Sequence, residues 1–226
     1  MSLKEDLRNE AREEREKLRN MTIKDKIWYI WEYYKFFIIG IVCTVGIAIS
    51  VGTTIYSNRF DTALYCVVIN NRTTEAGNQD QVLEELKDYL NLSDVREIVY
   101  DTSMFISYGE NTNELGYATM AKISALVASR ELDIMIADKE SIDNYAKLGG
   151  MTDLEEALPA DLYEKVKDRI YYTDNEEGQK QPCAVSLEGT KFAEDMNLVM
   201  DPPLISLFSN SENTENCIAL FHYIFD

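Results

Sequence analysis

Residues 63–69 have the sequence ALYCVVI and are bounded by polar and charged residues on both sides. A short, continuous apolar run of this kind is typical of a strand that is buried on both of its faces. The next segment, DQVLEELKDYLNL at residues 80–92, places its apolar residues on one face of a helix. A second strand is predicted over residues 95–100, so the order is strand, helix, strand.

The same order continues along the chain. Residues 102–113 are polar and predict a loop, residues 115–131 have helical spacing, and LDIMIAD at residues 132–138 predicts a third strand. Alternating strands and helices indicate right-handed crossovers, so we expect an α/β domain with a mainly parallel sheet and flanking helices. The remaining expectations are helices over residues 140–148, 153–158 and 160–167, two strands joined by a turn within 169–187, a strand within 202–208 and a closing helix over 217–225.

A membrane-spanning helix is predicted upstream of this domain. Residues 36–56 contain no charged side chain, and as a helix they would extend about 31 Å, the thickness of a bilayer's hydrocarbon layer. A cleaved signal peptide is the alternative, because residues 48–50 (AIS) resemble a small-x-small cleavage site. The 35 residues that precede the apolar run are longer than the usual basic leader of a signal peptide. We therefore favour an uncleaved signal-anchor that crosses the membrane once.

Basic residues predict the orientation of this span. Five of them lie within twenty residues before it and two within twenty residues after it, so the N-terminus is expected in the cytoplasm and the C-terminal domain outside the cell. Aromatic residues between positions 28 and 37 fit a belt at the cytoplasmic headgroups. The predicted organisation is a charged, helical cytoplasmic segment with a bend near residues 20–22 (1–35), a transmembrane helix (36–56) and an extracytoplasmic domain (57–226).

The charge of the chain is strongly asymmetric. The net charge is −18, and nine basic against eight acidic residues precede the span, which leaves 13 basic and 32 acidic residues for the outer domain. Such an acidic surface repels nucleic acid and anionic lipid, so neither is expected as a ligand of that domain. The bilayer itself is a partner only through residues 36–56.

No motif for catalysis or for a metal is present. The chain lacks a G-x-S-x-G elbow, a Walker loop, a dinucleotide glycine fingerprint, HExxH and CxxC. Cys66, Cys183 and Cys217 lie in apolar contexts outside the span and are expected as buried apolar residues, and His222 has no neighbouring ligand residue. We therefore expect a protein that is not an enzyme, with no catalytic residue, no metal site and no cofactor.

Two segments of the outer domain resemble the extracellular solute-binding proteins of bacterial ABC importers. In residues 117–159, Asp133 opens a strand that ends in Ala137-Asp138, and a helix carrying YAKLG is followed by Asp153-Leu154 and Leu158-Pro159. In residues 207–225 (LFSNSENTENCIALFHYIF), Asn210-Ser211 precede a helix with the family's pattern of aromatic residues. This chain is shorter than two full lobes of that family and lacks its lipobox.

The resemblance implies a class 2 periplasmic-binding-protein fold, in which a ligand lies at the carboxyl ends of strands. If such a site is present, Asn70, Asn71 and Asp138 are its candidate residues, and ordinary turn and helix-cap chemistry is the alternative role for them. The expected function is recognition of a small molecule or a partner by a membrane-anchored sensory or accessory domain. A cell-envelope interaction protein without a small-molecule ligand is the second hypothesis.

Overall fold

The computed structural model describes residues 22–57, 62–73, 77–109 and 112–226. The chain divides into two units, Met1–Arg59 and Phe60–Asp226. Residues 1–21 of the predicted cytoplasmic segment lie outside the described residues, and so does the predicted bend near residues 20–22 except at Thr22.

Among the described residues of the first unit, helix α2 extends over Ile23–Ser57. Its 35 residues correspond to about 52 Å. Within it, Tyr34–Thr53 is long and apolar enough to cross a membrane, and none of that stretch is buried inside the protein. This stretch begins and ends two or three residues before the expected span. Length and composition fit a membrane anchor and an amino-terminal signal alike.

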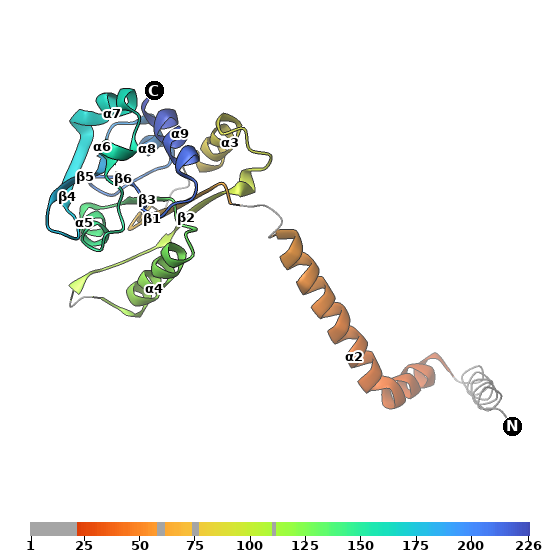
Figure 1. The fold of residues 1–226 in the computed structure, drawn as a ribbon. Coiled ribbons are helices and arrows are strands. Elements are labelled where there is room, and N and C mark those ends of the chain that lie inside the picture. Colours follow the sequence, from red (N-terminus) through yellow and green to blue (C-terminus); the bar gives the residue numbers. More distant parts are fainter. Residues whose placement is uncertain (1–21, 58–61, 74–76, 110–111) are drawn as a thin grey trace. The chain divides into compact units, whose positions relative to one another are not determined.

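The second unit is an α/β domain with six strands in its described residues (Figure 1). The strands are β1 (Leu64–Ile69), β2 (Ile98–Met104), β3 (Ile134–Ala137), β4 (Ile170–Asp174), β5 (Lys180–Ser186) and β6 (Leu204–Leu207). The α-helices are α3 (Gln79–Tyr89), α4 (Glu114–Ala128), α5 (Lys139–Lys147), α6 (Leu154–Ala157), α7 (Ala160–Val166), α8 (Lys191–Asp195) and α9 (Thr214–Phe225). Short 3-10 helices occupy Val95–Glu97 and Lys167–Arg169.

The sheet is mixed, so the expectation of a mainly parallel sheet is not met. The strand order is β2-β1-β3-β6-β5-β4. Only β1 with β2 and β1 with β3 pair in parallel, whereas β3 with β6, β6 with β5 and β5 with β4 are antiparallel. Strands β4 and β5 must pair antiparallel, because only five residues connect them and a parallel pair requires a crossover of a dozen or more.

Strand β2 lies later in the chain than expected. Residues 95–97 form a 3-10 turn instead of strand, because the Asp94 side chain accepts from the Arg96 amide while the Glu97 carboxylate accepts from the Asp94 amide. The strand then continues to Met104, into the segment that was expected to be a loop. The residues after Met104 are therefore delivered to the carboxyl edge of the sheet.

Helices cover both faces of the sheet (Figure 1). Along β1, Leu64, Cys66 and Val68 face a core formed with α3, α6, α7, α8 and α9, whereas Val67 and Ile69 face a core formed with α4 and α5. This alternation follows from the two-residue period of a strand. All of these β1 side chains are 2% exposed or less, as expected for a strand buried on both faces.

A fully buried carboxylate, Asp133, joins the amino end of β3 to the rest of the domain. Its Oδ2 accepts from the Tyr65 amide at 2.8 Å and from Asn213 Nδ2 at 3.2 Å, and its Oδ1 accepts from the Ser211 hydroxyl at 2.5 Å. A buried charge is tolerated only when such partners replace its hydration. The carboxylate thus connects β1, β3 and the segment that leads into α9.

Replacing this carboxylate should destabilise the domain. Asp133→Ala leaves the Tyr65 amide without its side-chain acceptor, and we expect a loss of about 3 kcal/mol in the free energy of unfolding. Chemical denaturation of the detergent-solubilised full chain measures this loss. The matched control is Asp168→Ala at an exposed position, which should change stability by less than about 0.5 kcal/mol. Equal stability of the two variants would contradict the assigned role.

Candidate functional site

The carboxyl ends of β1, β2 and β3 lie at one edge of the sheet, because these three strands are parallel. From β1 the chain crosses to β2 on one side, and from β2 it crosses to β3 on the other side of β1. The connections therefore diverge between β1 and β3. The place where the connections diverge is called the topological switch point, and in α/β sheets ligands bind there.

Asn70 follows β1 directly and has a positive φ of 62°. Asparagine adopts this left-handed conformation more readily than most residues do. Its amide spans the switch point: Oδ1 accepts from the Ile106 amide at 2.9 Å and Nδ2 donates to Asp138 Oδ2 at 2.7 Å. The side chain therefore links the ends of all three parallel strands.

Asp138 follows β3 and caps α5. Its Oδ1 accepts from the Ser141 amide at 2.9 Å, while Oδ2 accepts from Asn70. This is helix-cap chemistry, the alternative considered for this residue. The same carboxylate also lines a cavity, so both roles meet in one side chain.

Asn71 points elsewhere and does not line that cavity. It is 4% exposed, its Nδ2 donates to the Asn197 carbonyl at 3.2 Å, and its Oδ1 accepts from the Val199 amide at 2.9 Å. These bonds hold the loop after α8. Because Met200 and Asp201 continue that loop, Asn71 positions residues of the cavity without touching its interior.

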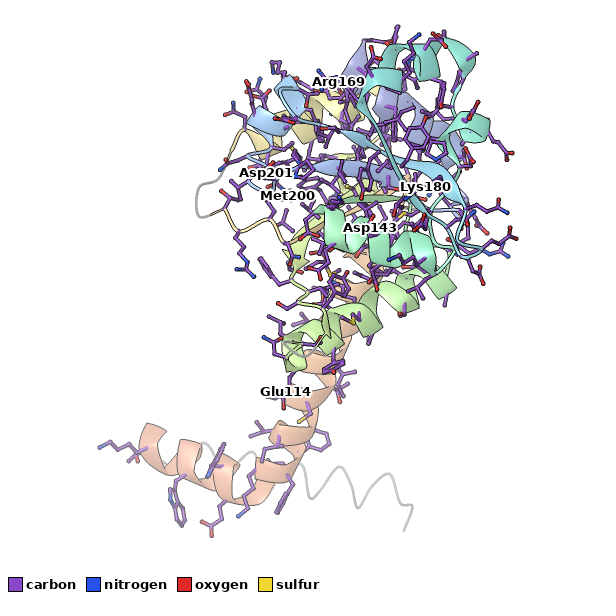
Figure 2. The ribbon with its side chains drawn as sticks, turned by 90° about the vertical axis from the view of Figure 1, so that its left-hand side faces the viewer. Glu114, Asp143, Arg169, Lys180, Met200 and Asp201 are labelled. Carbon is purple, nitrogen blue, oxygen red and sulfur yellow. The ribbon has the colours of Figure 1, made fainter. Side chains whose placement is uncertain are left out.

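We call the space above Asn70 and Asp138 the switch-point cavity. Its volume is about 500 Å³, within the range of small-molecule sites. Figure 2 shows Met200 and Asp201 together on the segment that leads into β6. The lining residues are Asn70, Arg72, Ile106, Ser107, Tyr108, Asp138, Glu140, Met200 and Asp201.

Three carboxylates and one guanidinium line this cavity. Asp138, Glu140 and Asp201 face the same space as Arg72, and no ion pair joins Arg72 to any of them within the part of the chain that the structure describes. The net charge of the lining is therefore negative. Such a cavity attracts cationic groups and also offers one site for an anionic group.

Of the predicted candidate residues, Asn70 and Asp138 line this cavity, and the other lining residues were not predicted. The predicted loop over residues 102–113 is correct at Ile106–Tyr108, but β2 was predicted to end at residue 100 and not at Met104, so these residues were not expected beside the end of a parallel strand. Met200 and Asp201 come from a loop whose approach to the first strand no local pattern encodes. The rule that ligands bind beyond parallel strand ends would have found Ile106–Tyr108 once β2 was correctly placed.

Two neighbouring hydroxyl groups at the cavity are buried and form no hydrogen bond of regular geometry with a described residue. They belong to Tyr108 and Ser141, and Ser141 is 0% exposed. Burial raises the pKa of Tyr108 to about 12, and the nearby Ser141 hydroxyl only moderates this rise. A buried hydroxyl without a partner costs about 1–3 kcal/mol.

The described residues also bear on two other kinds of chemistry, that of a metal site and that of a reactive cysteine. They contain no group of three or more His, Cys, Asp or Glu side chains that could hold a metal ion. Cys66, Cys183 and Cys217 are free and buried, and burial raises the pKa of Cys183 and of Cys217 to about 12. Thiols with such a pKa are protonated at neutral pH, which makes them poor nucleophiles.

Comparison of the chain with protein-family models, with curated proteins and with solved structures finds no match.

Removing the Tyr108 hydroxyl should stabilise the free protein. Tyr108→Phe deletes a buried group without a partner, so we expect a gain of about 1 kcal/mol at pH 7. The pKa of Tyr108 in the folded state lies above its ordinary value of 10.0, so the unfolded chain releases this proton more readily than the folded protein does. The parent protein should therefore lose stability as the pH rises from 10 towards 12.

Chemical denaturation between pH 7 and 12 measures both effects. The loss of stability at alkaline pH should be smaller in Tyr108→Phe than in the parent protein. Tyr117→Phe, at a tyrosine that is 63% exposed, is the matched control and should change neither quantity. A destabilised Tyr108→Phe would show that this hydroxyl has a partner after all.

Proposed function

We propose that this chain is a membrane-anchored recognition domain of the solute-binding type, which binds a small molecule outside the cytoplasm. The observation that carries the proposal is the switch-point cavity, where Asn70 and Asp138 from two strand ends meet beneath polar side chains of separate loops. A binding role without catalysis fits a cavity that lacks an activated nucleophile. The domain acts as a sensor or as an accessory subunit.

Support for the solute-binding family comes from the two segments that resemble it. Asp133 belongs to the first segment and Ser211 to the second, and their side chains are joined by a hydrogen bond of 2.5 Å. The two patterns thus lie in contact although 78 residues separate Asp133 from Ser211. The described outer residues form one sheet, so a ligand would lie on a single lobe and remain partly open to solvent.

Helix α2 supplies the anchor in this proposal. Trp28 and Trp31 are 70% and 58% exposed. Tyr34, Phe36 and Phe37 are also exposed, which suits an aromatic belt at the level of the lipid headgroups. Together with the basic residues before the span, this exposure supports a topology in which the N-terminus lies in the cytoplasm of a bacterial cell and the acidic domain lies outside. The protein is then a single-pass protein of the cell membrane.

Cysteine labelling tests this topology. Glu177→Cys, at an exposed position of the turn between β4 and β5, should react with a membrane-impermeant maleimide on intact cells. Ser2→Cys should react only after the membrane is permeabilised. The parent protein is the background control, because its three cysteines outside the span are buried. Labelling of Ser2→Cys on intact cells, or loss of the first residues by cleavage, would refute the anchor.

Thermal unfolding of the detergent-solubilised full chain tests ligand binding. A library of amino acids, amines, sugars and short peptides should contain compounds that raise the melting temperature, because a ligand at 100 times its Kd adds about 2.7 kcal/mol of stability. Glu140→Ala in the cavity should reduce the shift. Glu164→Ala on α7, also exposed, should leave it unchanged. A flat response across the library contradicts small-molecule binding.

A second candidate function is docking of an envelope protein, and helix α4 favours it. Leu115 and Tyr117 are 56% and 63% exposed, and four alanines beside them also face solvent. Only Glu114 and Lys122 are charged among its 15 residues, although the chain as a whole is 27% charged. Exposed apolar patches of this kind mark interaction surfaces.

A further inference from the structure

A second cavity adjoins the first along helix α5, and we call it the α5 cavity. Its volume is about 450 Å³, and it shares Tyr108 and Glu140 with the switch-point cavity. The lining residues are Tyr108, Lys139, Glu140, Asp143, Asn144 and Lys147. Tyr108 therefore stands between two spaces that together suit a ligand longer than either space alone.

The α5 cavity follows one face of its helix. Glu140, Asp143, Asn144 and Lys147 have the spacing of residues that share a helical face. From Glu140 to Lys147 the helix rises about 10 Å. A ligand that spans the two cavities is therefore extended, with ends about 10 Å apart.

The charges of the two cavities differ. In the α5 cavity, Asp143 already accepts from the Tyr171 hydroxyl at 2.7 Å, and Lys139 lies over the Tyr171 ring at 5.5 Å. Lys147 is exposed, and no ion pair engages it in the described part of the chain. The far end of the α5 cavity thus offers a cation, whereas Asp138, Glu140 and Asp201 make the switch-point cavity acidic.

We propose that the two cavities form one bipartite site for an elongated zwitterion. Its ammonium group lies between Glu140 and Asp201 in the switch-point cavity, its apolar chain crosses Tyr108, and its carboxylate reaches Lys147. This inference rests on the proposed function, since it assigns the ligand class of the same cavity.

Isothermal titration calorimetry of the detergent-solubilised full chain at pH 7 tests the ligand class. The probes are glycine, 4-aminobutanoate, 6-aminohexanoate and 8-aminooctanoate, in which the two charges are held progressively farther apart. We expect the affinity to rise along this series. Blocking either charge, as 8-aminooctanamide or as N-acetyl-8-aminooctanoate, should weaken binding at least about threefold, the effect of one exposed ion pair.

Single substitutions test the polarity of the site. Lys147→Gln should weaken 8-aminooctanoate about threefold and leave the binding of its amide unchanged. Glu140→Gln should weaken both compounds. Lys165→Gln on α7, which packs on the other face of the sheet, is the matched control and should alter neither. Circular dichroism of each variant establishes that it is folded.

The opposite results are also defined. Tightest binding of glycine, lost in Arg72→Gln but not in Lys147→Gln, would place both charges in the switch-point cavity and overturn the bipartite site. Binding of a neutral sugar, with no response to any zwitterion, would overturn this inference while the proposed function stands. If no compound in the broader library binds either, the proposed function fails as well.

Discussion

The placement of β1 between β2 and β3 is the constraint on which the site depends. Because both neighbours run parallel to β1, the carboxyl ends of three strands lie at one edge of the sheet. The connections that follow them leave in opposite directions. Polar groups at that edge cannot all be paired by strand hydrogen bonds, so side chains must complete the pairing. The Asn70 amide does so by bonding the Ile106 amide and the Asp138 carboxylate at once.

Local patterns predicted the elements well where burial and periodicity coincide. The buried run of β1, the helical face of α3 and the strand before Asp138 were all found, because each is encoded within a few residues. The mixed sheet was missed, because the position of β6 between β3 and β5 depends on pairing with strands far away in the sequence. The capping box at Asp94 likewise displaced the start of β2, since a local hydrogen-bond motif overrode the strand preference of Val95.

The residues of the candidate site also differ in how far local sequence patterns predict them. Asn70 and Asp138 follow strands and were found from the sequence, whereas Asp201 enters the cavity through a loop that Asn71 holds in place. Asn71 shows why residue type alone does not predict which residues line the cavity. Of the two adjacent asparagines, Asn70 lines the cavity, whereas Asn71 bonds the backbone of the loop after α8. The predicted absence of catalytic, metal and cofactor residues stays a prediction.

The buried Asp133 lies at the amino end of β3, and the cavity lies beyond its carboxyl end. About 16 Å of extended chain separates Asp133 from Asp138, a distance at which substitutions usually act independently. The buried carboxylate and the cavity thus lie at opposite ends of β3. Substitutions of the cavity residues should therefore leave the contacts of Asp133, which join β1, β3 and the segment before α9, unchanged.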